Sequence, residues 1–241
     1  MQIEQWLTDV IGRGELVPGD RLPPEGDLAV ALGVSRMTLR QALATMEAHG
    51  TVVRKPGRTG GTYVSQPRIE TDLTGLAGFT EQMRRASVRA GARLISATTV
   101  RAPGVVAEAL SLGSRAKVHE IVRVRTARRE PLALERTYLP ANVFPDLLDH
   151  RLTGSIYDLM SRRYGQVPYK AREVLDPVAA AATEAKLLRV SPDTPLMQIE
   201  RTTFTAAGLG VEFARDLFRP DRVRISFETG VGSASRAARP N

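Results

Sequence analysis

The chain has 241 residues, of which 42% are hydrophobic and 25% are charged, a composition typical of globular proteins and not of disordered or fibrous ones. No apolar run reaches the roughly 18 to 20 residues that cross a bilayer, and the acidic N-terminal segment does not fit a secretory signal. The absence of cysteine excludes disulfides, thiolate metal ligands and a thiol nucleophile. We therefore expect a cytoplasmic protein with no cofactor, no metal and no membrane contact.

The net charge of +8, from 34 basic and 26 acidic residues, suggests a polyanionic partner. The charge is unevenly distributed along the chain. Residues 1–28 contain six acidic and two basic residues, whereas residues 29–66 contain five basic and one acidic residue. The N-terminal segment is thus neutral overall but polarised, and the local pattern has to show where a nucleic acid would bind.

The first part of the chain carries the pattern of a small helical domain followed by a hairpin. Apolar residues at helical spacing predict an amphipathic helix at its start, and VPGDRLPPE then interrupts regular structure. A second helix is predicted over residues 25–32, and a third begins after a Ser35 cap and stops at Gly50. TVVRKPGRTGGTYV has two β-branched runs around a glycine-rich turn, which is typical of a hairpin. We expect one domain over residues 1–66.

The rest of the chain predicts interspersed helices and strands. A linker is expected at residues 67–78, a second domain at 79–228 and a disordered tail at 229–241, which lacks the apolar content to pack. Short turns join several of the predicted strands, which favours antiparallel hairpins and an α+β fold. Strands are expected at residues 93–102, 117–128, 132–139, 167–175, 196–205 and 211–219, and helices at 79–90, 105–112, 155–164 and 178–188.

The segment RLPPEGDLAVALGVSRMTLRQAL has the form of a helix–turn–helix, in which the second helix enters the major groove of DNA. Arg36 and Arg40 are four residues apart and project from one face, with Thr38 on the first turn between them. An arginine can bond bidentately to guanine or hold a phosphate, and the amides of a helix start favour anions. Arg58 adds positive charge to the hairpin, and Gly60 and Gly61 allow it a close approach. The alternative is a helical domain with solvated arginines.

Residues 1–66 resemble the winged helix–turn–helix of the GntR transcription regulators through PGDRLPPE, LGVSRMTLRQAL and GRTGGTYV. The resemblance implies DNA contacts from Arg36, Thr38, Arg40 and the wing near Gly60 and Gly61, whereas Arg58 is included for its charge alone. Gly26 stands where the family has an arginine that contacts phosphate, and Pro24 replaces a serine cap.

In the second domain, valines at positions 118, 122 and 124 alternate with a face that bears Arg123 and Arg125. Two arginines on one strand face repel each other unless an anion lies between them, and in a pocket they would hold a phosphate or carboxylate. The alternative is a solvated sheet face. Ser155 begins a capped helix whose exposed amides, around Ser155 and Ile156, form a possible anion site. Glu135 and Glu212 add acceptors.

The order RVRTARREPLALERTYLP, SIYDLM and VEFARDLFRPDR resembles the UTRA effector domain of the HutC subgroup. This resemblance implies the chorismate lyase fold, an antiparallel sheet flanked by helices. Phe218 falls where the sugar-phosphate sensors of the group tend to have tyrosine. The candidate effector-binding residues are Arg123, Arg125, Glu135, Ser155, Ile156, Glu212 and Phe218.

Together these patterns predict a ligand-responsive transcription regulator. It would act as a homodimeric repressor that binds a palindromic double-stranded operator and is released by a small anionic effector, either a sugar phosphate or a carboxylate. Two alternatives remain. One is a chorismate-lyase-like enzyme, although His49, His119 and His150 are far apart and show no catalytic spacing. The other is a DNA-binding protein that needs no ligand.

Overall fold

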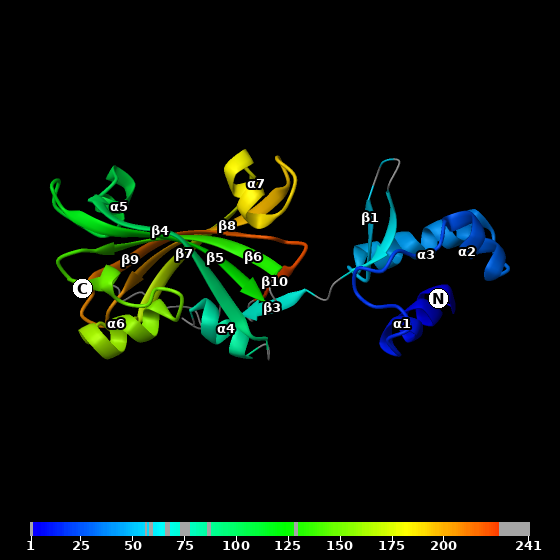
Figure 1. Ribbon diagram of the computed structural model, residues 1–241, viewed down its shortest axis with the longest axis horizontal. Coiled ribbons are helices and arrows are strands. Elements are labelled where there is room, and N and C mark those ends of the chain that lie inside the picture. Colours follow the sequence, from blue (N-terminus) through cyan, green and yellow to red (C-terminus); the bar gives the residue numbers. More distant parts are fainter. Residues whose placement is uncertain are drawn as a thin grey trace, which may run out of the picture. The chain divides into compact units, whose positions relative to one another are not determined.

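The computed structural model describes residues 2–55, 57, 60–65, 68–72, 78–85, 88–127 and 130–226. The chain forms two compact units, Met1–Arg68 and Ile69–Asn241, whose helices and strands are labelled in Figure 1. Across the described segments, none of the helices is long and apolar enough to cross a membrane.

The N-terminal unit packs helices against a short hairpin. Its elements are α1 (Gln2–Gly12), α2 (Glu25–Ala31) and α3 (Arg36–Ala48), with β1 (Val52–Lys55) antiparallel to β2 (Gly61–Val64). The helix α3 begins where Ser35 Oγ accepts a hydrogen bond from the Thr38 backbone N–H at 3.1 Å, as the predicted serine cap requires. The winged helix–turn–helix is confirmed. Its core is formed by Leu7, Leu22, Leu28, Ala29, Leu39, Leu43, Met46, Val52 and Val64.

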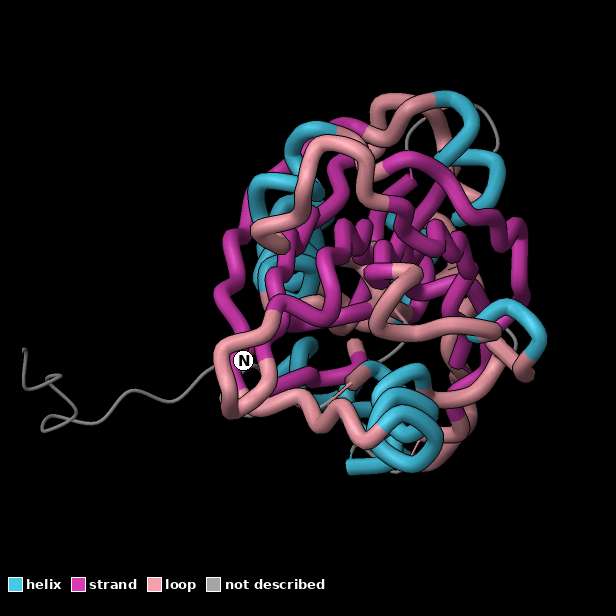
Figure 2. The backbone as a smooth tube through the Cα atoms, turned by 90° about the vertical axis from the view of Figure 1, so that its left-hand side faces the viewer, coloured by secondary structure: helices cyan, strands magenta, loops and turns pink. Residues whose placement is uncertain are grey.

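The C-terminal unit is built on a six-stranded antiparallel sheet in the order β4-β5-β6-β9-β8-β7. Helices α5 and α7 lie on one face of the sheet and α4 and α6 on the other (Figure 1), and Figure 2 shows the strands between these helical layers. The α+β fold is confirmed. The strands are β4 (Ala90–Arg101), β5 (Lys117–Ala127), β6 (Glu130–Pro140), β7 (Lys170–Ala179), β8 (Pro195–Phe204) and β9 (Gly210–Phe218), and the helices are α4 (Phe79–Arg85), α5 (Gly104–Ala109), the 3₁₀ helix Leu147–Asp149, α6 (Ile156–Tyr164) and α7 (Ala182–Leu188).

Because helices cover both faces, the central strands are buried on both sides. On β5, Val122 and Val124 pack into the cluster that contains Leu188 of α7, and Ile121 packs into the cluster that contains Met160 of α6. Side chains on the two faces of β5 therefore pack into two different hydrophobic clusters, as the predicted alternation requires. The face that bears Arg123 and Arg125 lies in the interior and is not the solvated sheet face of the alternative interpretation.

Several element boundaries differ from the sequence-based expectations. The strand predicted over residues 167–175 runs over Lys170–Ala179, and the helix predicted over residues 105–112 ends at Ala109. The helix predicted over residues 178–188 was wrong at its start, because β7 continues to Ala179 by pairing with β8 and α7 begins only at Ala182. There the Glu184 side chain accepts a hydrogen bond from the Ala181 N–H at 2.9 Å. The helix predicted over residues 79–90 ends at Arg85.

The segment expected to be a linker contains a strand. In this segment β3 (Ile69–Asp72) pairs in parallel with β10 (Val223–Ser226), with Ile69 opposite Val223. Both residues join the cluster that contains Met83 of α4. The first and last described strands of the C-terminal unit are therefore bonded to each other. The tail expected at residues 229–241 lies outside the described residues.

Candidate functional site

The face of α3 that the sequence assigns to DNA is open. Arg36, Thr38 and Arg40 are exposed, whereas Leu39 and Leu43 on the opposite face are buried in the core. The helix therefore presents its N-terminal arginines to the surroundings while its apolar stripe holds it in place. Exposed guanidinium groups at the start of such a helix have the geometry to contact base edges or phosphates.

Neighbouring groups position Arg40. Its Nε donates to Glu25 Oε2 of α2 at 2.7 Å, and its backbone carbonyl accepts a hydrogen bond from Arg54 Nη2 of β1 at 3.0 Å. Ion pairs at a protein surface are worth about 0–1 kcal/mol. A phosphate group can therefore replace Glu25 as the partner of Arg40 at little cost.

The base of the wing is fixed by an arginine outside the predicted DNA-binding set. Arg21 Nη2 donates to the Gly60 carbonyl at 2.6 Å. Gly61 has φ +152°, a conformation that favours glycine, and a Cβ atom there would lie 2.6 Å from Arg21 Nε, so a side chain at position 61 would displace Arg21. The predicted contact Arg58 lies outside the described residues. The hollow beside the wing has a volume of about 270 Å³, and the basic residues that line it are Arg21, Arg40, Arg54 and Lys55.

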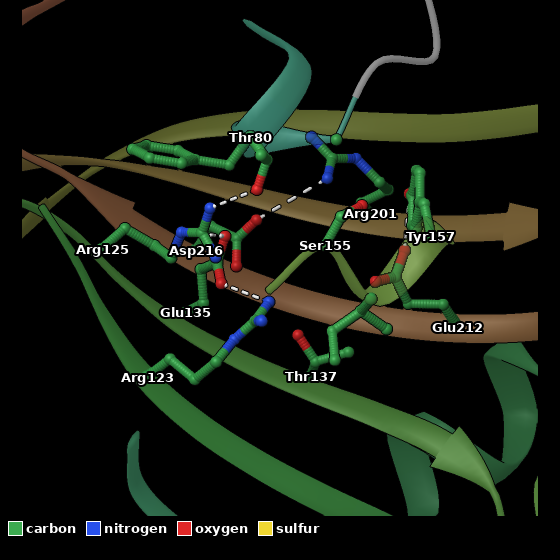
Figure 3. Close-up of a pocket in the computed structure, with 13 residues that line it drawn as sticks. Thr80, Arg123, Arg125, Glu135, Thr137, Ser155, Tyr157, Arg201, Glu212 and Asp216 are labelled. Atoms are coloured by element: carbon green, nitrogen blue, oxygen red, sulfur yellow. Dashed lines mark hydrogen bonds and ion pairs between the residues drawn. The ribbon is translucent and has the colours of Figure 1, made fainter. Parts of the chain in front are cut away.

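A second candidate site is a polar cavity of about 30 Å³ in the C-terminal unit, between the sheet and helices α4 and α6 (Figure 3). Six of the predicted effector-binding residues line it: Arg123, Arg125, Glu135, Ser155, Ile156 and Glu212. Side chains that the sequence reasoning missed also line it: Phe79, Thr80, Thr137, Tyr157, Arg201 and Asp216.

The predicted arginine pair is buried and shares one carboxylate. Arg123 and Arg125 are only 5% and 2% exposed. Glu135 of β6 lies opposite Arg123 in the sheet, and its oxygens are 2.7 Å from Arg123 Nη2 and 3.6 Å from Arg125 Nε. The strand pairing therefore places one negative side chain against two positive ones.

Further contacts fix the direction of each guanidinium group. Arg123 Nη1 donates to the carbonyls of Leu152 and Gly154 at 2.9 and 3.0 Å, just before α6. Arg125 Nη2 donates to Thr80 Oγ1 of α4 at 2.8 Å, and its guanidinium carbon lies 4.4 Å from the centre of the Phe79 ring. Burial lowers the pKa of Arg125, but an arginine keeps its charge in proteins.

The start of α6 lines the same cavity. Ser155 Oγ accepts a hydrogen bond from the Asp158 N–H at 3.1 Å, so the predicted cap is present, and Ser155 and Ile156 line the cavity. Amides at the first turn of a helix carry partial positive charge and bind anions. This helix start and the arginine pair therefore favour the same kind of ligand.

The opposite side of the cavity is acidic and hydroxyl-bearing. Glu212 Oε2 accepts hydrogen bonds from Tyr157 at 2.7 Å and Thr203 at 2.8 Å. Arg201 donates to Glu173 and lies 3.8 Å from Asp216 Oδ2. Burial and then the Glu212 carboxylate raise the pKa of Tyr157 well above its usual range, so this phenol stays a hydrogen-bond donor.

Phe218 does not take the place expected of it. It is absent from the cavity lining and packs in the α4 cluster, with its ring centre 6.5 Å from that of Phe79. Phe79 lines the cavity and stacks with Arg125. Phe218 therefore supports a lining residue from behind, and its role as an effector contact stays a prediction.

The histidines give no indication of catalysis. His119 Nδ1 lies 2.9 Å from Thr99 Oγ1, and its Nε2 lies 2.9 Å from the Phe144 carbonyl. Nδ1 thus contacts β4, and Nε2 holds the loop after β6 against the sheet. Within the described part of the chain, no group of His, Asp and Glu residues is suited to bind a metal ion.

A winged helix–turn–helix joined to a separate unit with a buried polar cavity defines a DNA-binding transcription regulator that responds to a small molecule. Comparison with known families agrees. Residues 1–64 match the bacterial regulatory proteins of the gntR family, and residues 85–224 match the UTRA domain. The chain belongs to the GntR family and carries a UTRA effector domain.

Individual relatives support this assignment. The transcriptional repressor NagR of Bacillus subtilis is 37% identical over 222 residues, covering 92% of this chain and 90% of the relative. The repressor PhnF of Mycolicibacterium smegmatis is 32% identical over 211 residues, covering 86% and 84%. The crystal structure of PhnF has a TM-score of 0.70 at 28% identity and covers 94% of this chain and 98% of that one. These relatives are regulators, so the enzyme alternative is excluded.

Proposed function

We propose that this protein is a repressor that binds a palindromic operator as a homodimer and leaves it when a small anionic metabolite, a sugar phosphate or a carboxylate, binds at Arg123 and Arg125. The observation that carries the proposal is the charge balance of this buried pair. Two guanidinium groups share the carboxylate of Glu135, so the arginine pair and this partner together carry a net positive charge at a buried position. Buried charge is costly unless it is compensated.

The contacts around the pair indicate the shape of the ligand group. The carbonyl contacts of Arg123 and the Thr80 contact of Arg125 direct the two side chains into one cavity beside the first turn of α6. Guanidinium groups bind the oxygens of phosphates and carboxylates bidentately, and the amides of a helix start add further donors. A tetrahedral or planar oxyanion satisfies all of these donors together.

The size of the cavity bears on how the ligand would act. A volume of about 30 Å³ is little more than the space that one or two water molecules occupy. A metabolite therefore requires Glu135, α4 or α6 to move. A ligand that binds one arrangement of these groups more tightly than another shifts the population of the two, which is the physical basis for release from DNA.

On the DNA side, the proposal assigns Arg36, Thr38 and Arg40 to the major groove and Gly60, Gly61 and Arg58 to the wing contact. The recognition helix α3 has 13 residues and can read only one half-site. A dimer that presents two such helices reads half-sites about one helical turn apart. The naming of NagR and PhnF as repressors supports the proposed sign of regulation.

The proposal is tested by titrating the full-length protein on operator DNA with a panel of phosphorylated and carboxylated metabolites, followed by fluorescence anisotropy. A compound that releases the wild-type protein should fail to release Arg123→Ala. Arg136→Ala is the matched control, since Arg136 lies on the same sheet, faces away from the cavity and pairs with Glu120 at the surface. It should respond as the wild type does.

A thermal shift measures the same binding without DNA. A ligand at 100 times its dissociation constant stabilises the folded state by about 2.7 kcal/mol. If no anion of the panel stabilises the protein or releases it from DNA, the ligand-independent alternative is correct. If the active compounds act equally on Arg123→Ala, the effector binds elsewhere.

A further inference from the structure

Asp216 is a buried acid with an unfilled hydrogen-bonding position. It lies on β9, lines the effector cavity and is 4% exposed. Its Oδ2 is 3.8 Å from Arg201 Nη1, whereas Oδ1 is buried and has no hydrogen-bond partner among the residues that the structure describes. A buried oxygen of this kind costs free energy unless it is paired. Figure 3 shows the carboxyl group of Asp216 beside Arg125 and Glu135.

Glu135 is the cross-strand partner of Asp216. The register of β6 and β9 places the two residues directly opposite each other, so their side chains share one sheet face. Two buried carboxylates at such positions repel each other, and the usual outcome is that one of them keeps its proton. Burial and then Glu135 raise the pKa of Asp216 well above its usual range, against the opposing effect of Arg201.

Other charged and titratable groups surround Asp216, and they come from its own strand and from the elements packed against it. Arg123 and Arg125 face it from β5, Arg201 from β8, Glu212 from its own strand and Tyr157 from α6. Arg201 also has Glu173 as a partner, and the arginine pair has Glu135. Asp216 thus lacks a cation of its own.

We propose, building on the function above, that Asp216 is a further anion-binding residue, which binds the effector's oxyanion as a neutral carboxyl group and donates an O–H hydrogen bond to it. An ionised Asp216 would repel an oxyanion at the arginine pair. A protonated carboxyl group has one O–H donor. A hydrogen bond from such a donor to a charged acceptor is among the strongest that proteins make. Any proton needed comes from solvent and remains on Asp216, and no other bond is formed or broken.

This assignment has a measurable consequence, because the anion enters together with a proton wherever Asp216 is ionised beforehand. In that pH range the dissociation constant should rise by up to about tenfold for each pH unit, by linkage of the two binding events. The variant Asp216→Asn provides the comparison, because its carboxamide has the same shape and an N–H donor but cannot take up a proton.

The test uses the full-length protein and inorganic sulfate, which remains a dianion throughout the range and so brings no proton of its own. Sulfate binding is measured by calorimetry from about pH 5.5 to about pH 8.5, in buffers with different heats of ionisation, which also reports the protons taken up. The wild type should bind more weakly as pH rises, with proton uptake. Asp216→Asn should bind with an affinity that changes by less than about twofold and without uptake. Glu200→Gln is the control, because Glu200 pairs with Arg215 on the other sheet face, and it should behave as the wild type.

Proton-free, pH-independent sulfate binding by the wild type would overturn the role of Asp216 at any pH where the stability comparison with Asp216→Asn shows that Asp216 is ionised before sulfate binds. An unchanged pH dependence in Asp216→Asn would overturn it as well. If Asp216→Asn does not fold, the proton uptake of the wild type decides alone. These results are distinct from failure of the proposed function. Sulfate that does not bind at all, or that binds Arg123→Ala as well as the wild type, would refute the anion site and the role of Asp216 together.

Discussion

Gly26 of α2 lies against the guanidinium group of Arg36, the first residue of α3: a Cβ atom at position 26 would come within 2.9 Å of Arg36 Nη2. The absence of a side chain at this position thus makes room for an arginine of the recognition helix. The same position carries a phosphate-contacting arginine in the family that the N-terminal sequence resembles. In this chain the space is used by Arg36 instead.

We therefore expect Gly26→Ala to displace Arg36 without unfolding the N-terminal unit. Operator binding should weaken by about 1–3 kcal/mol, the value of one arginine contact, because the guanidinium group has to move. Stability should not fall, since alanine favours a helix over glycine by about 0.5–1 kcal/mol. Anisotropy and thermal unfolding measure the two effects. At Gly12 of α1 an added Cβ meets nothing within 4 Å, so Gly12→Ala should leave DNA binding unchanged.

Arg40→Ala should weaken operator binding by about 1–3 kcal/mol with little loss of stability, because its ion pair with Glu25 is at the surface. Gel-shift titration of specific and unrelated duplexes measures the change. A loss confined to the operator indicates a base contact, and an equal loss on both indicates a phosphate contact. Arg13→Ala, which removes an exposed arginine paired with Glu15, should have no effect. Full operator affinity in Arg40→Ala would refute the assignment.

Glu135→Gln should destabilise the C-terminal unit by about 3–5 kcal/mol, because it leaves Arg123 and Arg125 buried without the carboxylate that they share. Urea unfolding followed by circular dichroism measures this loss. Glu200→Gln breaks a more exposed pair with Arg215 and should cost no more than about 1 kcal/mol. Equal losses of stability in the two variants would mean that Arg123 and Arg125 do not depend on the carboxylate of Glu135 for compensation of their charge.

The stability of the wild type should depend on pH through Asp216, even without a ligand. Its pKa is raised in the folded state, so its contribution is complete below the usual carboxyl pKa of about 4 and is lost as pH rises through the folded value. Asp216→Asn has no such loss. The unfolding free energy of Asp216→Asn minus that of the wild type should therefore grow with pH, by up to about 1.4 kcal/mol per unit. Urea unfolding at several pH values tests this, and a constant difference would contradict it.

Local patterns in the sequence predicted those parts of the site that lie on single elements. The period of two along β5 identified Arg123 and Arg125 as one face, and the Ser155 cap located the start of α6. Arg201 and Asp216 were not found, because they belong to the site only through the strand order β5-β6-β9-β8. That order places Asp216 opposite Glu135, a relation that no local spacing contains.

The boundary errors have a similar origin. Residues 178–188 carry a helical pattern, but cross-strand bonds with β8 keep Val178 in β7, and such bonds depend on a partner remote in sequence. Phe218 follows the alternation of the cavity residues on β9, yet it lies at the end of the strand where the Phe79 ring covers it. Contacts between elements remote in sequence thus determine both the start of α7 and the position of Phe218.

The parallel pair of β3 and β10 decides where the effector domain can be cut from the chain. A fragment starting at Phe79 would lack Ile69, and Val223 would lose the neighbour that pairs with it and helps to cover Met83. Such a fragment should aggregate through the bare edge of β10. A fragment that starts at Ile69 keeps β3 paired with β10 and is therefore better suited to separate expression.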